Sequence, residues 1–283
     1  MTETDTPRRP GPWDPRPEDI STPPAAPEPA RAAEPPLDKG QTPVWAVIST
    51  VLLGGFIWWI SGSWVIAVAL IWGLFVHEFG HVLAMNRLGM GPARIYIIPF
   101  LGGVAKSQRL PQSEWHGVLV SLAGPAFGLL AAIPFFAGFV ATGQGAWLLG
   151  AAVIAAVNLI NLAPAPPLDG SKALGPVLAR VHPRLEQLAM LAVGGLVVWW
   201  GVVTGRWILA AFLAIALIGH LKRGAWRPEG RPLSGRESAF SVGLFIATTA
   251  ACVGVGLAAL MPLGGGSLPV ALDIAGRYLG IGR

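Results

Sequence analysis

Two histidines and a glutamate stand close together in the motif His77-Glu78-Phe79-Gly80-His81. On an α-helix, residues four apart lie on the same face one turn apart, so His77 and His81 could both bind one metal ion. Glu78 lies next to them, where its carboxylate could accept a proton from a water molecule at that metal. The motif therefore predicts a zinc peptidase site in which Glu78 is the catalytic residue.

The segment that carries this motif, Trp64–Leu88, is otherwise apolar. It exceeds the roughly 20 residues that an α-helix needs to span a bilayer. An Asp, Lys or Arg at bilayer depth costs roughly 2.5–3.5 kcal/mol, so ionisable groups there usually mark function. The alternative is a chance match to the motif in an ordinary helix. This alternative is weakened because three polar side chains at bilayer depth have no water to bind, and without a function nothing would offset that cost.

A catalytic zinc usually has three protein ligands and keeps one position open. The third candidate is Asp169, which follows a helix that the prolines of Asn161-Leu-Ala-Pro164-Ala-Pro166-Pro167-Leu168 would end. On the residues alone Asp169 could instead cap a short helix, and Asn161 could form a hydrogen bond between helices. The remaining histidines, all expected near span ends, are His116, His182 and His220.

Composition points to lipid as the surrounding solvent. Of the 283 residues, 53% are hydrophobic and only 12% are charged, whereas a soluble domain carries about 25% charged residues. The net charge is +5, but the basic residues after position 42 stand in short loops between apolar segments, so they indicate membrane topology and no nucleic-acid partner. The single cysteine, Cys252, excludes an intrachain disulfide.

The apolar segments predict an all-α polytopic membrane protein with about 6–7 transmembrane helices. We expect a disordered, proline-rich tail over residues 1–42, an intramembrane core over 43–222, and a basic loop over 223–238. One additional transmembrane helix follows over 239–261, and a C-terminal tail over 262–283. The predicted spans are 44–60, 64–88, 115–141, 146–163, 185–204, 207–221 and 240–261.

Loop charge predicts the orientation of these spans. Lysines and arginines gather after the second, fourth and sixth spans, and the intervening loops contain only Arg206. Positive loops stay in the cytoplasm, so we expect a multi-pass protein of a bacterial cell membrane with its N-terminus in the cytoplasm. The histidine pair then lies toward the cytoplasmic side.

The connection between the second and third spans, Ala93–Lys106, is apolar and partly β-branched. Pro99 and the pair Gly102-Gly103 would break a helix in it. We therefore expect a small re-entrant β-hairpin there, with a plain connecting loop as the alternative.

The motif HEFGH in an early span and NLAPAPPLDG in a later one together resemble the site-2 protease family of intramembrane zinc peptidases. The resemblance covers roughly Trp64–Lys172. It implies that one zinc ion per chain is bound by His77, His81 and Asp169, and that Gly102 and Gly103 belong to a strand that, with Asn161, binds the substrate. One position departs from the family pattern, because Gly128 stands where the family often has asparagine. Gly124 and Gly128, four residues apart, instead predict close packing between helices.

These observations predict an intramembrane zinc endopeptidase that cleaves membrane-spanning proteins in or near their transmembrane segments, as in regulated intramembrane proteolysis. The expected partners are that protein substrate and the lipid bilayer; the residues do not identify a regulatory partner. The alternative is a non-catalytic membrane protein, either a metal-binding transporter or an inactive scaffold. A transporter should carry further ionisable groups along its spans, and here these groups gather at one end.

Overall fold

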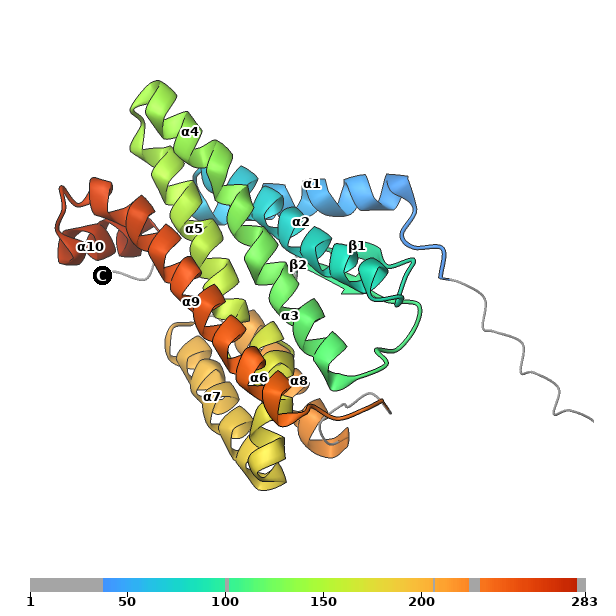
Figure 1. Cartoon of the computed structure of the whole chain (residues 1–283). Coiled ribbons are helices and arrows are strands. Elements are labelled where there is room, and N and C mark those ends of the chain that lie inside the picture. The colour runs from blue at the N-terminus through green and yellow to red at the C-terminus, as the bar shows by residue number, and fades with distance from the viewer. Residues whose placement is uncertain (1–37, 100–101, 206, 224–229, 279–283) are drawn as a thin grey trace, which may run out of the picture. The chain divides into compact units, whose positions relative to one another are not determined.

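The computed structural model describes residues 38–99, 102–205, 207–223 and 230–278. It is mostly helical and has one two-stranded antiparallel sheet, in agreement with the expected fold class (Figure 1). In chain order the elements are α1 (Pro43–Ser61), α2 (Trp64–Arg87), β1 (Arg94–Ile98), β2 (Gly102–Lys106), α3 (Glu114–Gly128), the 3₁₀-helix η2 (Leu129–Ala132), α4 (Ile133–Thr142), α5 (Gly145–Asn161), α6 (Asp169–Val181), α7 (Pro183–Val203), α8 (Trp207–Arg223), α9 (Gly235–Leu263) and α10 (Leu268–Tyr278).

Helix α2, which carries the histidine motif, packs against α1, α3, α5 and both strands. Its start is determined locally: Gly62 ends α1 in the left-handed conformation, and the Ser63 side chain accepts a hydrogen bond from the Ile66 N–H. Helix α3 comes close to α2 inside the motif itself, where a Cβ on Gly80 would stand 2.5 Å from the Ala123 carbonyl oxygen and 2.8 Å from the Phe127 Cβ. One face of α2 stays exposed, at Trp72 and Phe75 for example, whereas the polar side chains His77, Glu78 and His81 lie on the buried face and are shielded from lipid.

Within the described residues, five helical segments are long and apolar enough to cross a membrane, namely Pro43–Ser61, Trp64–Arg87, Glu114–Thr142, Pro183–Val203 and Gly235–Leu263. Two further apolar helices, Gly145–Asn161 and Ala210–Gly219, are shorter. Large apolar side chains such as Trp59, Val140 and Ile215 are more than two-thirds exposed, which suits contact with lipid and not with water. These features agree with a membrane protein, and the total of 6–7 spans stays a prediction.

The third predicted span is not one continuous α-helix. The four residues of η2 separate α3 from α4, and Pro134 stands in the first turn of α4. Proline has no N–H to continue the α-helical hydrogen bonds but is favoured in a first helical turn, so the helix is interrupted before it and begins again there.

The hairpin predicted over Ala93–Lys106 is confirmed as the pair β1–β2, with Ile97 opposite Gly103 and Ile95 opposite Ala105. The free edge of β1 is covered by a side chain from the segment before α1. The Ile97 N–H donates to Gln41 Oε1 (2.9 Å), and Gln41 Nε2 donates to the Ile97 carbonyl (3.0 Å) and to Ser49 Oγ (3.1 Å). Residues 38–42, which the sequence placed in an unpacked tail, therefore contact the hairpin and α1; residues 1–37 lie outside the described part of the chain.

Helix α9 packs along α5 and also contacts α3 and α6 (Figure 1). Its N-terminus is closed by a capping box, in which Ser234 and Glu237 each bind the other's backbone N–H. A further short helix, α10, lies in the segment expected to be only a tail.

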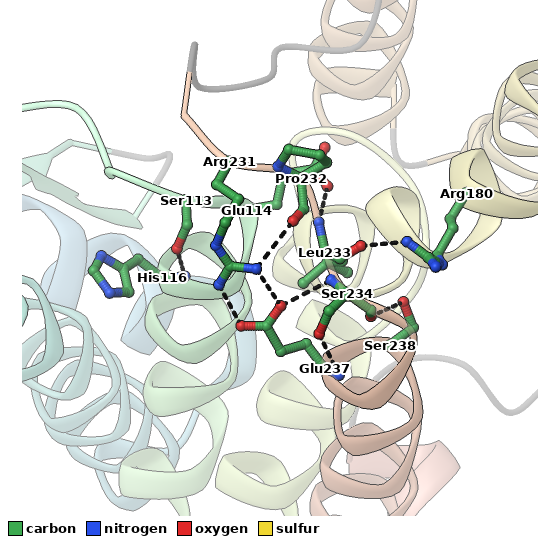
Figure 2. Close-up of polar contacts among 10 residues, drawn as sticks. All are labelled: Ser113, Glu114, His116, Arg180, Arg231, Pro232, Leu233, Ser234, Glu237 and Ser238. Atoms are coloured by element: carbon green, nitrogen blue, oxygen red, sulfur yellow. Dashed lines mark hydrogen bonds and ion pairs between the residues drawn. The ribbon is translucent and has the colours of Figure 1, made fainter. Parts of the chain in front are cut away.

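Polar contacts tie the start of α9 to the start of α3; we call this contact, between residues 112–114 and 231–237, the α3–α9 junction (Figure 2). The Glu114 N–H donates to the Arg231 carbonyl (3.0 Å), and Glu114 Oε2 accepts from the buried Leu233 N–H (2.9 Å). The Arg231 guanidinium binds both oxygens of Glu237 at 2.9 and 2.6 Å. Arg180 of α6 donates to the Leu233 carbonyl, so α6 joins the same junction.

Candidate metal centre

Three side chains from two distant parts of the chain meet inside the helical bundle. His77 and His81 come from the middle of α2, and Asp169 is the first residue of α6. The two Nε2 atoms are 3.1 Å apart, and Asp169 Oδ2 lies 3.2 Å from that of His77 and 3.3 Å from that of His81. All three side chains are buried, and among the described residues they form the one group of three or more His, Cys, Asp or Glu side chains close enough to share a metal ion.

Asp169 reaches this position because of the turn between α5 and α6. Helix α5 ends at Asn161, and the proline-containing segment 162–168 forms turns before α6 begins at Asp169. A side chain at Gly170 would overlap the Leu162 carbonyl, so this turn requires glycine directly after the aspartate. The residue in the N-cap position is Leu168, and no side chain caps the helix. Asp169 therefore does not act as the cap of α6.

The other nitrogen of each histidine is held by a buried oxygen. His81 Nδ1 lies 2.8 Å from the Val120 carbonyl, which can only accept, so His81 Nδ1 carries the proton. His77 Nδ1 lies 2.9 Å from Asn158 Oδ1, and the amide orientation of Asn158 follows from the hydrogen bond that its Nδ2 donates to the Ile154 carbonyl. In their neutral forms both rings therefore present an unprotonated Nε2 to Asp169.

This donor set fits a zinc ion. Two imidazole lone pairs and a carboxylate oxygen face one another, and such a set of acceptors needs a positive charge between its members. For tetrahedral zinc with bonds of 2.0–2.1 Å, neighbouring ligand atoms are about 3.3 Å apart, close to the three distances found here. On α3, Gly124 leaves room for both histidine rings, because a Cβ at this position would overlap the His81 ring and lie 2.9 Å from His77 Nε2.

Glu78 is buried beside this cluster and next to the hairpin. Its carboxylate interacts electrostatically with both histidines and with Asp169, and the backbone of Ala105 in β2 lies close to it. A Cβ on Gly103 would come within 2.8 Å of Glu78 Cγ, so the strand can lie this close to the glutamate only with glycine there. Glu78 is thus a neighbour of the three candidate ligands and has contact with β2.

The other residues singled out from the sequence are spread more widely. Gly102 begins β2 with a positive φ of 118°, and Asn161 ends α5 with its Nδ2 bonded to the Val157 carbonyl (3.2 Å). His182 accepts a hydrogen bond from the Arg184 N–H at the start of α7, and His116 lies in the first turn of α3, so neither belongs to the cluster. The side chain of His220 lies outside the described residues.

Three contacts at the site were not assigned from the sequence: the Asn158 amide, the Val120 carbonyl and the space beside Gly124. Asn158 had a visible signal, as an amide in an apolar helix close to Asn161. The expected packing role of Gly124 and Gly128 takes a different form, since they make room for the His81 ring and the Asn158 amide respectively. The Val120 contact had no signal, because any residue type supplies a carbonyl.

Comparison with known proteins gives two matches. Residues 65–149 match the family described as Peptidase family M50, and this range includes His77, Glu78 and His81 but not Asp169. A protein of Synechocystis sp. named "Putative zinc metalloprotease" is 30% identical over 132 residues, which are 44% of this chain and 33% of the relative. The match thus spans about one third of that relative's length, and no solved structure matches.

Both matches agree with the family that the two motifs predicted. The M50 peptidases are the site-2 protease family, and the relative carries a metalloprotease name. The resemblance to the site-2 protease family, peptidase family M50, is therefore confirmed over residues 65–149, the part of the chain that the family model matches.

Proposed function

We propose that this chain is an intramembrane zinc endopeptidase that hydrolyses peptide bonds within or near the transmembrane segments of other proteins. The observation that carries the proposal is the buried triangle of His77, His81 and Asp169 with Glu78 beside it. This arrangement combines three metal ligands with one free carboxylate, which is what hydrolysis at a metal requires.

In this proposal His77, His81 and Asp169 would hold one zinc ion, which when bound supplies a Lewis acid that polarises the substrate carbonyl and makes water a stronger nucleophile at neutral pH. Glu78 would accept the proton of the attacking water and later donate it to the leaving amine nitrogen.

The hairpin suggests how the substrate chain is held. The backbone N–H and C=O of Ile97 both bond to Gln41, so they point away from β2. In an antiparallel pair, directly opposite residues share this property, so the N–H and C=O of Gly103 point away from β1. An unwound substrate could therefore add as a strand along β2, with its scissile bond next to Glu78.

We assign Gly102, Gly103 and Asn161 to substrate binding on this basis. A peptide bond inside a helix is hydrogen-bonded and shielded, and strand addition would replace those hydrogen bonds with bonds to β2. The proposed setting is a bacterial cell membrane, with the site toward the cytoplasm and membrane-spanning proteins as substrates in regulated intramembrane proteolysis.

The substitution Glu78→Gln tests the catalytic role. It keeps the size of the side chain and leaves all three proposed ligands in place, so the zinc content should stay near that of the wild type. Cleavage of a co-expressed single-span reporter should fall by at least about 10²–10⁴-fold, the usual effect of losing a positioned acid–base group. Metal analysis of the purified variant is run beside the cleavage assay.

The rival functions predict other results. A metal transporter would show altered transport and no cleavage in either form, and a scaffold would show no change in any readout. Cleavage by the glutamine variant at the wild-type rate would remove Glu78 from the mechanism.

A further inference from the structure

Asn158 is buried in α5, 1% exposed, and its side chain makes two hydrogen bonds. Its Oδ1 lies 2.9 Å from His77 Nδ1, and its Nδ2 donates to the Ile154 carbonyl at 2.8 Å. The second bond determines which end of the amide faces the histidine, because the opposite orientation would place two oxygens against each other. The amide is therefore fixed as an acceptor toward His77.

The space for this amide exists because α3 has no side chain at Gly128. A Cβ built on Gly128 would overlap Asn158 Oδ1 and lie 2.7 Å from Asn158 Cγ. Gly128 is followed by η2, and its own φ of −55° is helical, so glycine is not required there by backbone conformation. The glycine is explained by the side chain that occupies the adjoining space.

We propose that Asn158 is the positioning residue for His77, and that Gly128 and Asn158 act as one pair in which the absent side chain of the first makes room for the amide of the second. By accepting a hydrogen bond from the Nδ1–H of His77, Asn158 Oδ1 keeps the Nε2 lone pair of that ring turned toward Asp169 and His81. The inference rests on the proposed function, since it concerns the affinity of that site for zinc.

The contact makes a quantitative prediction, because loss of a hydrogen-bond partner behind a metal-binding histidine typically costs 10–100-fold in metal affinity. Asn158→Leu, which has a similar volume but no acceptor, should weaken zinc binding by that factor. Asn158→Asp keeps an acceptor oxygen and should retain more of the affinity than Asn158→Leu. A residue that only fills space would give the opposite order, because leucine suits an apolar helix better than a carboxylate does.

The pair is tested by a double-mutant cycle. Gly128→Ala should weaken zinc binding in the wild-type background by pushing the Asn158 amide away from His77. In the Asn158→Ala background the same substitution should have little further effect, because no amide is left to displace. The control is Thr248→Ala on α9, whose Oγ1 donates to the Leu244 carbonyl of its own helix and whose loss should leave zinc affinity unchanged.

The experiment measures zinc dissociation constants by chelator competition on the full chain in detergent, with Glu78→Gln present throughout so that no variant can cleave itself. Circular dichroism of the zinc-free variants verifies that each is folded. If the parent binds no zinc, the proposed function fails. The positioning role is wrong if the Glu78→Gln background protein binds zinc and the added Asn158→Leu changes its zinc dissociation constant by no more than about twofold. It is also wrong if the substitutions at Gly128 and Asn158 have additive effects on zinc affinity. In both cases the proposed function stands.

Discussion

At the scale of single residues, the site depends on which atoms each side chain has left after its structural contacts are made. His77 and His81 use Nδ1 for buried oxygens, and Asp169 has no role as a helix cap. The atoms that remain, two Nε2 and one carboxylate oxygen, all face the same point. The burial of these groups is compatible with folding because each ring has a partner on its far side, and a cation between them removes the mutual repulsion.

Asp169→Asn should therefore lose most of the bound zinc. The amide has nearly the same shape, so the turn into α6 should survive, but the charge of the ligand is lost and zinc affinity should fall by more than about tenfold. The measurement is zinc content and affinity of the purified variant. Asp273→Asn, which breaks the exposed pair with Arg277 on α10, is the matched control and should bind zinc normally. Full zinc occupancy in Asp169→Asn would contradict the assignment of this ligand.

At the scale of the elements, the hairpin has one covered edge and one edge next to the site. Gln41 covers β1, and the same short segment is tied to the base of the hairpin by Asp38, which pairs with Lys106 at 2.8 Å. The Lys106 ammonium holds the pKa of Asp38 well below its usual range. A lowered carboxyl pKa stabilises the folded state above the usual pKa of aspartate and stops doing so as the pH falls, so this contact should persist at neutral and mildly acidic pH.

Gln41→Ala should loosen the hairpin. The substitution leaves the N–H and C=O of Ile97 without their partners, at a cost of about 1–3 kcal/mol for each buried group that stays unpaired. The expected results are a lower unfolding temperature in detergent and faster hydrogen exchange of the Ile97 amide. Gln144→Ala, at an exposed helix start where the side chain forms no cap, is the control. Unchanged exchange at Ile97 would mean that another group covers the β1 edge.

At the scale of the whole described chain, α9 packs against the helices that surround the candidate metal centre, namely α3, α5 and α6. The α3–α9 junction joins α3, α6 and α9, and Ser241 of α9 donates to the Ala173 carbonyl in the helix that begins with Asp169. The buried residues Val118, Leu122, Leu162, Ala173, Leu233 and Cys252 form one apolar cluster that includes the same helices. The helix expected to be an addition to the core is therefore part of the packing around α6.

Glu114→Ala tests this packing. It removes the acceptor of the buried Leu233 N–H, which should cost about 1–3 kcal/mol and lower the unfolding temperature. The control is Arg277→Ala, which breaks an exposed pair within α10 and should cause no measurable change. If both variants unfold at the wild-type temperature, the junction does not stabilise the folded state.

The sequence alone determined the features that depend on short-range geometry. Two histidines four residues apart share a helix face wherever the helix lies, and a long apolar segment predicts a span from its length alone. Pro99 and the two glycines after it exclude a helix locally, so they predicted either a hairpin or a plain loop and left the choice between these two open. The third proposed ligand was accessible only through the resemblance, since Asp169 taken by itself also fitted a helix cap.

Tertiary structure decided the features that need atoms from distant parts of the chain. No local pattern shows that the Val120 carbonyl holds His81, or that Gly128 is small because Asn158 from another helix fills its place. The tie between residues 38–42 and the hairpin, and the packing of α9 on α6, are likewise contacts between separate segments. Periodicity reports which face of an element is apolar, whereas the partner of that face is determined only when all the elements pack together.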